Sequence, residues 1–213
     1  MKKCIILLSL ILLLTGCINI NKSSYETIIN EVLTSKVNIY NQYRDGYKYY
    51  LPHGLYVSTS KEYNELIKSE RYNYYLYIDV ISYLNQVKNK YKENSSSNYS
   101  FLINSGDKSG YLEINEEKDK YLVEIMYNYA KIEVIVEEKD IKKAISNAII
   151  ILSSIHYNDS VLSSINEANI LSYGDEAIDI FNSKSGSDAS NFLEYIEEYD
   201  PVDEEVADYD LIK

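Results

Sequence analysis

The spacing of apolar residues predicts two long amphipathic helices, one near each end of the chain. Within residues 25–36, apolar side chains recur at intervals of three and four, as on one buried face of an α-helix. Ser23 and Glu26 are three positions apart, which is typical of a capping box at a helix start. A second helix is expected after Asp140, where the helical spacing continues to Ile155.

The residues between these helices predict strands. Alternating or β-branched runs indicate a strand at 46–51 that stops at a Pro-x-Gly turn, and a central strand over most of 72–83. Three further runs are joined by short turns, so an antiparallel meander is expected at 110–114, 120–127 and 131–137.

Two segments of this middle region are expected to depart from the strand pattern. Thr59 and Glu62 resemble a second capping box, which predicts a short helix that carries Tyr63, Leu66 and Ile67. Residues 93–100 are rich in Ser and Asn and are expected to form a loop.

Together these elements predict a single α+β domain over residues 25–183, in which an antiparallel meander sheet is packed by an N-terminal and a C-terminal amphipathic helix. An α/β/α sandwich is the alternative arrangement. Residues 158–182 are expected to add a helix or strand at the rim. Residues 184–213 carry many acidic and few apolar side chains, so we expect a flexible, disordered tail that cannot bury enough apolar surface to fold.

The first residues have a different pattern. Lys2 and Lys3 precede an apolar run at 5–14 that only Ser9 interrupts. This run is shorter than the roughly 20 residues that span a bilayer, but it suits the apolar region of a signal peptide. It ends in the tetrapeptide Leu14-Thr15-Gly16-Cys17.

That tetrapeptide resembles the lipobox of bacterial lipoproteins. The resemblance implies that the Cys17 thiol receives a diacylglycerol and that a peptidase cleaves between Gly16 and Cys17. Residues 1–16 would be the signal peptide and 17–24 a polar tether. Acyl chains such as palmitate would hold the protein in the lipid bilayer, on the extracytoplasmic face of the cell membrane. An uncleaved N-terminal helix that happens to contain a cysteine is the alternative.

The order of the predicted elements also loosely resembles the PsbP-like and DcrB-like group of α/β/α sandwiches. The resemblance is carried by Leu51-Pro52-His53-Gly54 and Leu152-Ser153-Ser154-Ile155. It implies a lipoprotein fold, and several members have no known enzymatic activity. A fold does not by itself determine a function.

Charge and reactive side chains narrow the function further. The formal net charge of −12 opposes binding to phosphate backbones, so no nucleic-acid partner is expected. Cys4 would be removed with the signal peptide and Cys17 would be acylated, which leaves no thiol for a disulfide or a metal. His53 lies in a predicted turn and His156 at a helix end, and neither belongs to a nucleophile motif. No cofactor and no metal are therefore expected.

Four acidic residues in predicted strands offer one route to catalysis. They are Asp79, Glu113, Glu124 and Glu133. If two of them met in a dry cleft, the pKa of one would rise and acid–base hydrolysis would become possible. We favour the alternative in which the glutamates alternate with apolar neighbours on a solvent-exposed sheet face. Asp79 is expected to accept hydrogen bonds from tyrosine hydroxyls or the backbone.

Tyrosine is unusually frequent, with 24 residues in the chain. Tyrosine gives a broad contact area with little loss of conformational entropy, as protein-binding surfaces require. Core packing is the competing explanation and accounts for about half of these residues. The sequence thus predicts a non-catalytic binding or assembly module for a protein or cell-wall partner, with a cell-envelope hydrolase as the alternative. The candidate binding residues are Tyr47, Tyr49, Tyr50, Tyr75 and Tyr77.

Overall fold

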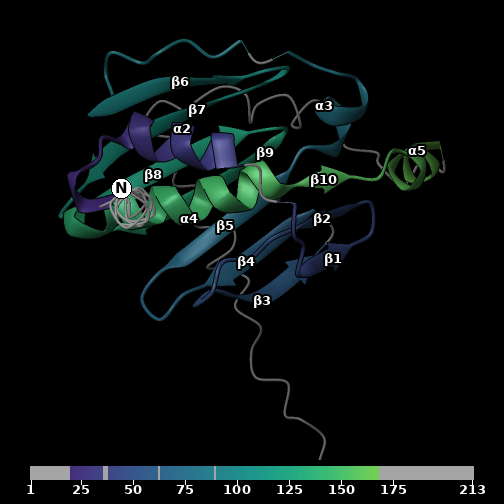
Figure 1. Ribbon diagram of the computed structural model, residues 1–213, viewed down its shortest axis with the longest axis horizontal. Helices are drawn as coiled ribbons and strands as arrows, with labels where there is room; N and C mark the ends of the chain where they lie inside the picture. Colours follow the sequence, from purple (N-terminus) through teal and green to yellow (C-terminus); the bar gives the residue numbers. More distant parts are fainter. Residues whose placement is uncertain (1–19, 36–37, 62, 89, 168–213) are drawn as a thin grey trace, which may run out of the picture. The chain divides into compact units, whose positions relative to one another are not determined.

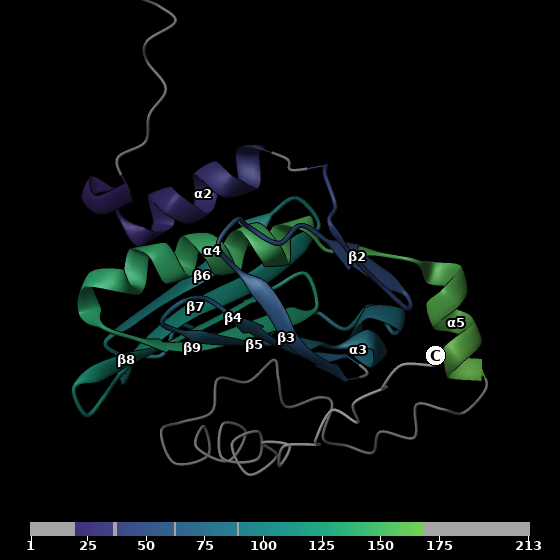
Figure 2. The same ribbon diagram turned by 90° about the horizontal axis from the view of Figure 1, so that it is seen from below.

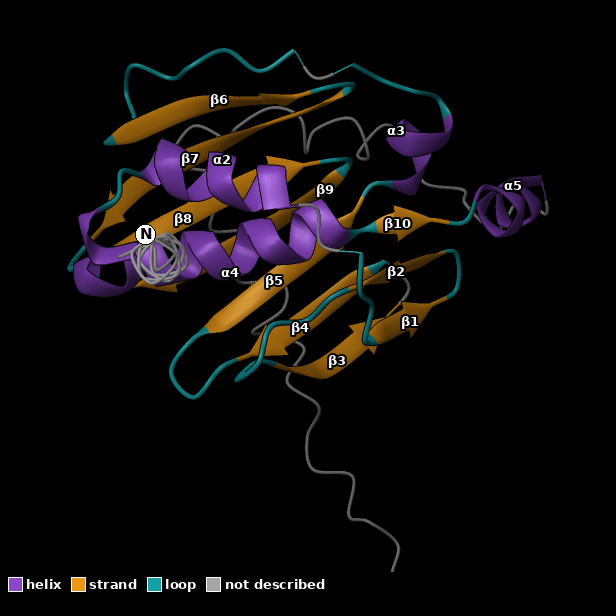
Figure 3. Cartoon of the chain, in the orientation of Figure 1, coloured by secondary structure: helices purple, strands orange, loops and turns teal. Residues whose placement is uncertain are grey.

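The computed structural model describes residues 20–35, 38–61, 63–88 and 90–167, and these residues belong to one compact unit. They form an α+β fold with two antiparallel sheets (Figures 1 and 3). The described part begins with a 3-10 turn, η1 (Ile20–Lys22), and ends with helix α5 (Asp159–Glu167). The predicted signal peptide, Cys17 and the acidic tail lie outside the described residues.

The larger sheet has seven strands, and each strand pairs antiparallel with its neighbours. Consecutive strands β7, β8 and β9 lie side by side, so the predicted meander is confirmed. Across the sheet, the order is β3 (Tyr56–Lys61), β4 (Asn64–Lys68), β5 (Asn73–Ile78), β9 (Ala130–Val136), β8 (Lys120–Tyr127), β7 (Lys108–Glu117) and β6 (Tyr99–Ser105).

The turn between β8 and β9 explains how the meander keeps its register. Asn128 and Tyr129 connect the strands, and their φ angles are 55° and 61°. Two consecutive residues with positive φ suit a tight two-residue hairpin turn, whose twist matches that of the strands. Tyr157 fixes the turn, because its hydroxyl donates to the Asn128 carbonyl at 2.7 Å.

Both long helices lie on the same face of this sheet, as the view in Figure 2 shows. Helix α4 (Ile141–Ser154) packs on β8 and β9, and helix α2 (Tyr25–Ser35) packs alongside it. Ala144 and Ala148 are fully buried, and their small side chains leave room for the packed neighbours of α4. The two predicted helices are therefore confirmed. The N-terminal cap of α2 is Ser24 rather than Ser23, since the Ser24 hydroxyl accepts from the Thr27 amide at 3.2 Å.

A second, three-stranded sheet has the order β1 (Gln42–Arg44), β2 (Tyr47–Tyr49) and β10 (His156–Tyr157). Strand β2 lies within the predicted strand at 46–51, whereas β1 and β10 were not expected. The hydroxyls of Tyr47 and Tyr49 contact a side chain of β4, so this sheet lies against the large one.

Three local predictions are wrong. The helix expected after Thr59 is the hairpin of β3 and β4, in which Glu65 and Ile67 are buried on one side of the strand. The central strand ends at Ile78, because Asp79 caps the short helix α3 (Val80–Leu84). The loop expected at 93–100 ends early, since β6 begins at Tyr99 and pairs with β7.

The ends of the predicted domain also need adjustment. Part of the tether expected at 17–24 is the ordered turn η1, and the Lys142 ammonium donates to the Asn21 carbonyl at 2.8 Å. The rim element expected at 158–182 is helix α5 in its first part, where Leu162 is fully buried. Residues 168–182 lie outside the described range.

Candidate functional site

The five candidate tyrosines do not share one exposed face. Tyr47, Tyr49 and Tyr75 are buried, while Tyr50 and Tyr77 are partly buried. The expected exposed tyrosine surface is therefore wrong for the first three residues. Tyr47 and Tyr49 turn toward the large sheet because a buried carboxylate there accepts their hydroxyls.

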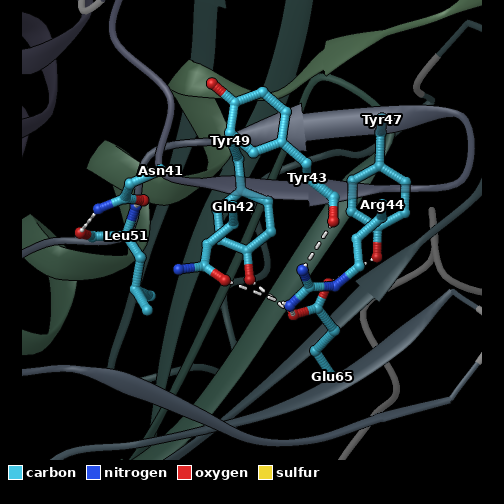
Figure 4. Close-up of polar contacts among 8 residues, drawn as sticks. All are labelled: Asn41, Gln42, Tyr43, Arg44, Tyr47, Tyr49, Leu51 and Glu65. Atoms are coloured by element: carbon cyan, nitrogen blue, oxygen red, sulfur yellow. Dashed lines mark hydrogen bonds and ion pairs between the residues drawn. The ribbon is translucent and has the colours of Figure 1, made fainter.

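That carboxylate is Glu65 on β4, the centre of a group that we call the Glu65 cluster (Figure 4). Tyr47 donates to Oε1 of Glu65 at 2.7 Å, and Tyr49 donates to Oε2 at 2.6 Å. Arg44 forms an ion pair with Oε2 at 2.9 Å and also donates to the Tyr43 carbonyl at 2.9 Å. Three donors from the small sheet thus converge on one side chain of the large sheet.

The electrostatics of the Glu65 cluster favour a structural role. Burial raises the pKa of the Tyr47 and Tyr49 phenols, and the nearby Glu65 carboxylate raises each pKa further. Both phenols therefore remain protonated donors at neutral pH. Glu65 is 3 % exposed, and a buried carboxylate needs such partners to offset its lost hydration. The cluster joins the two sheets.

The opposite face of the large sheet carries a row of three glutamates, which we call the glutamate row. Glu113 on β7 lies directly opposite Glu124 on β8, and Glu124 lies opposite Glu133 on β9. Directly opposed residues on antiparallel strands have Cβ atoms about 4.5–5.5 Å apart. Lys131 contributes the nearby positive charge, with Nζ 2.7 Å from Glu133 and 3.8 Å from Glu124.

The glutamate row is buried, so the expectation of a solvent-exposed face is wrong. The segment between α3 and β6 covers part of this face, because the Tyr91 ring stacks on the Tyr111 ring with their centroids 4.1 Å apart. Four side chains donate to Glu113, namely those of Tyr91, Asn94, Ser97 and Asn115.

The middle member of the row has an altered acidity. Burial raises the pKa of Glu124 to about 7, and the neighbouring Glu133 adds to this shift while Lys131 opposes it. The Tyr111 hydroxyl donates to Glu124, and Oε2 of Glu133 is buried without a hydrogen-bond partner. Glu124 can therefore exchange a proton near neutral pH, which is the acidity that acid–base chemistry requires.

Asp79 is separate from the glutamate row. Its Oδ1 accepts from the Ser82 amide at 2.8 Å, which confirms the expected backbone hydrogen bond, and burial raises its pKa. Tyr75 lies opposite Glu133, and Asp79 is four residues farther along the chain. At a rise of about 3.3 Å per residue, Asp79 lies roughly 13 Å along the strand direction from Tyr75, the residue opposite Glu133. The structure does not bring Asp79 beside a glutamate of the row.

A hollow of about 400 Å³ opens on the helical side of the fold. It lies between three segments that sequence patterns did not connect: the 53–55 turn, the 69–72 turn between β4 and β5, and the first turns of α4. Tyr72 donates to Asp140 at 2.7 Å, and Arg71 forms a longer ion pair with Asp140 at 3.7 Å. Lys143 and Asn147 complete the α4 side of the hollow.

His53 lies in the expected turn and is exposed at the edge of this hollow. The turn at 52–54 therefore forms part of a candidate ligand site. No sequence signal joins His53 to Arg71 or Lys143, because the three residues are far apart in the chain and meet only through the tertiary fold.

The described ranges lack two kinds of feature. No group of three or more His, Cys, Asp or Glu side chains there is arranged to hold a metal ion. No helix in this part of the chain is long and apolar enough to cross a membrane.

Comparison of the chain with protein-family models, curated proteins and solved structures gives no match.

Proposed function

We propose that this chain is a lipid-anchored lipoprotein on the extracytoplasmic face of the cell membrane, where its α+β domain is a non-catalytic binding module. The observation that carries the proposal is the tetrapeptide Leu14-Thr15-Gly16-Cys17 after a short basic and then apolar segment. The acyl chains on Cys17 would be the membrane anchor, and a protein or cell-wall component would be the partner.

The fold supports this proposal in two ways. The described structure begins at Ile20, which is three residues after Cys17 in the sequence, and the Asn21 carbonyl accepts a hydrogen bond from Lys142 of α4. An anchor at Cys17 would therefore hold the domain close to the bilayer. The hollow beside His53 then offers a polar, concave surface of a size that suits a small ligand or part of a larger one, within the usual range of about 300–1,000 Å³.

A cell-envelope hydrolase is the second candidate, and one observation favours it. The glutamate row brings three acids together, and Glu124 has a pKa of about 7. Against this candidate, Glu113 is occupied by several donors, and the hollow described above contains no member of the row. Hydrolysis of cell-wall polymer by the wild-type protein, with loss in Glu124→Gln, would favour the hydrolase over the binding module.

Cell fractionation combined with crosslinking tests the binding module. We expect the wild-type protein in the membrane fraction of intact cells, crosslinked to a defined partner. The Cys17→Ala variant should lose both the membrane retention and the partner. Equal retention of the two forms after cell disruption would contradict the anchor, and a wild-type protein with no crosslinked partner would contradict the binding role.

A further inference from the structure

The hollow lies at the end of the domain where the chain emerges from the predicted anchor. Lys142 binds the Asn21 carbonyl, and the next residue, Lys143, lines the hollow. Cys17 precedes Asn21 by four residues, which span at most about 14 Å when extended. A lipidated Cys17 would therefore hold the hollow within reach of the lipid headgroups.

The lining of the hollow combines cations with hydrogen-bonding groups. Arg71 and Lys143 approach from different elements, and His53 lies on a third. Asp140 forms an ion pair with Arg71 at 3.7 Å and accepts a hydrogen bond from the Tyr72 hydroxyl at 2.7 Å. Arginine and lysine donate charge-assisted hydrogen bonds to phosphate oxygens.

The remaining polar groups that line the hollow can accept hydrogen bonds from hydroxyl groups of a ligand. The Asn147 amide donates to the Tyr74 hydroxyl at 3.3 Å, so Asn147 keeps its carbonyl oxygen as an acceptor on the wall of the hollow. The acids Glu70 and Asp140 add further acceptors. A ligand that carried a phosphate alone would leave these acceptors unused, whereas a phosphate bonded to a polyol would engage both kinds of group.

We propose that the hollow binds the glycerol phosphodiester headgroup of an anionic membrane lipid, with Arg71 and Lys143 on the phosphate and Asn147 on a glycerol hydroxyl. This inference rests on the proposed lipid anchor, which supplies the position at the bilayer. The bound headgroup and the lipid anchor would together fix the orientation of the domain on the membrane. The attraction to an anionic lipid would be local to the hollow, since the whole chain is acidic with a net charge of −12.

Thiol labelling of the full-length protein, expressed with its own signal peptide and placed in lipid nanodiscs, tests this inference. Cys4 and Cys17 are the only cysteines of the chain, so a processed and acylated wild-type protein has no free thiol. A cysteine introduced as His53→Cys at the edge of the hollow then reports on occupancy through its rate of reaction with a polar maleimide. Asn21→Cys is the matched control, since Asn21 is exposed near the anchor but does not line the hollow.

We expect His53→Cys to react about tenfold more slowly in phosphatidylglycerol nanodiscs than in phosphatidylcholine nanodiscs, after correction by the Asn21→Cys rates. That factor corresponds to a headgroup concentration about ten times its dissociation constant. Adding Arg71→Gln and Lys143→Gln should restore the phosphatidylcholine rate. Soluble glycerophosphoglycerol, added at the same bulk concentration to phosphatidylcholine nanodiscs, should give little protection.

Equal corrected rates in the two lipids, or protection that survives Arg71→Gln and Lys143→Gln, would overturn the headgroup site. Equal protection by soluble glycerophosphoglycerol would also overturn it, because the ligand source would then be soluble. Failure of the lipid anchor itself is distinguished from these outcomes: the wild-type protein would react with maleimide through Cys4 or Cys17.

Discussion

Glu124 and Glu133 lie directly opposite each other on β8 and β9, and Lys131 contacts both carboxylates from the same face of the sheet. Both glutamates are buried, with 6 % and 4 % of their surfaces exposed. One lysine cannot neutralise two carboxylates, and Glu113 adds a third acid on the other side of Glu124. The electrostatic energy of the glutamate row is therefore lower when Glu124 is protonated than when it is charged.

This arrangement predicts that the folded protein loses stability as the pH rises toward neutrality. Burial raises the pKa of Glu124 from 4.5 to about 7, so between these values the folded state binds more protons than the unfolded state. The free energy of unfolding should fall as the pH increases through this window, by about 3 kcal/mol at most for this group. Urea unfolding at pH 5 and pH 8, followed by far-ultraviolet circular dichroism, measures the difference.

The Glu124→Gln variant isolates the contribution of this side chain. Glutamine keeps an oxygen to accept the Tyr111 hydroxyl but has no charge to bury. We expect the variant to be less dependent on pH and at least as stable as the wild-type protein at pH 8. Identical pH profiles for the two proteins would refute the raised pKa as the cause.

The Glu65 cluster predicts a large effect from a single truncation. Glu65→Ala would leave the buried Tyr47 and Tyr49 hydroxyls and the partly buried Arg44 guanidinium without their shared acceptor. Removing one partner of a buried ion pair costs about 3–5 kcal/mol of stability. Chemical unfolding of the variant measures this loss.

Ser60→Ala is the matched control for Glu65→Ala. Ser60 lies directly opposite Glu65 on the edge strand β3, but it is exposed. Its substitution should change the free energy of unfolding by no more than about 0.5 kcal/mol. If Glu65→Ala were as mild as Ser60→Ala, the cluster would not hold the two sheets together.

Gly110 on β7 should not tolerate any side chain. A Cβ atom there would lie 1.9 Å from the Met126 carbonyl oxygen, in the backbone of the neighbouring strand. Gly110→Ala should therefore disrupt the β7–β8 pairing and lower the melting temperature strongly or prevent folding. Gly106→Asn is the control: Gly106 has a φ of 64°, which asparagine accepts, and a Cβ there meets nothing within 4 Å. Equal melting temperatures for the two variants would contradict the close approach at Gly110.

Sequence periodicity predicted those helices and strands in which the spacing of apolar residues matches the face that is buried. The apolar stripe of α4 and the strands β7 to β9 were found because each buries a regular set of apolar residues. The β3–β4 hairpin was missed because Tyr63, Leu66 and Ile67 fit helical spacing as well as a strand. Pairing with β5 decides between the two, and this tertiary contact is absent from the local sequence.

The polar residues show a clearer limit of sequence reasoning. The members of the glutamate row alternate with apolar neighbours as solvent-exposed residues do, and Glu65 lies in a segment predicted to be helical, yet all four glutamates are buried. What covers Glu65 is a second sheet built partly from β10, more than 90 residues later in the chain. The hollow at His53 likewise joins three segments that are distant in sequence, so no local pattern could predict it.

The central claim is that Cys17 carries the membrane anchor. Growth of the expressing cells with radiolabelled palmitate, followed by isolation of the protein, tests it most directly. We predict label in the wild-type protein and none in the Cys17→Ala variant produced at the same level. Absence of label from the wild-type protein, or equal label in both forms, would contradict the anchor and the extracytoplasmic location together.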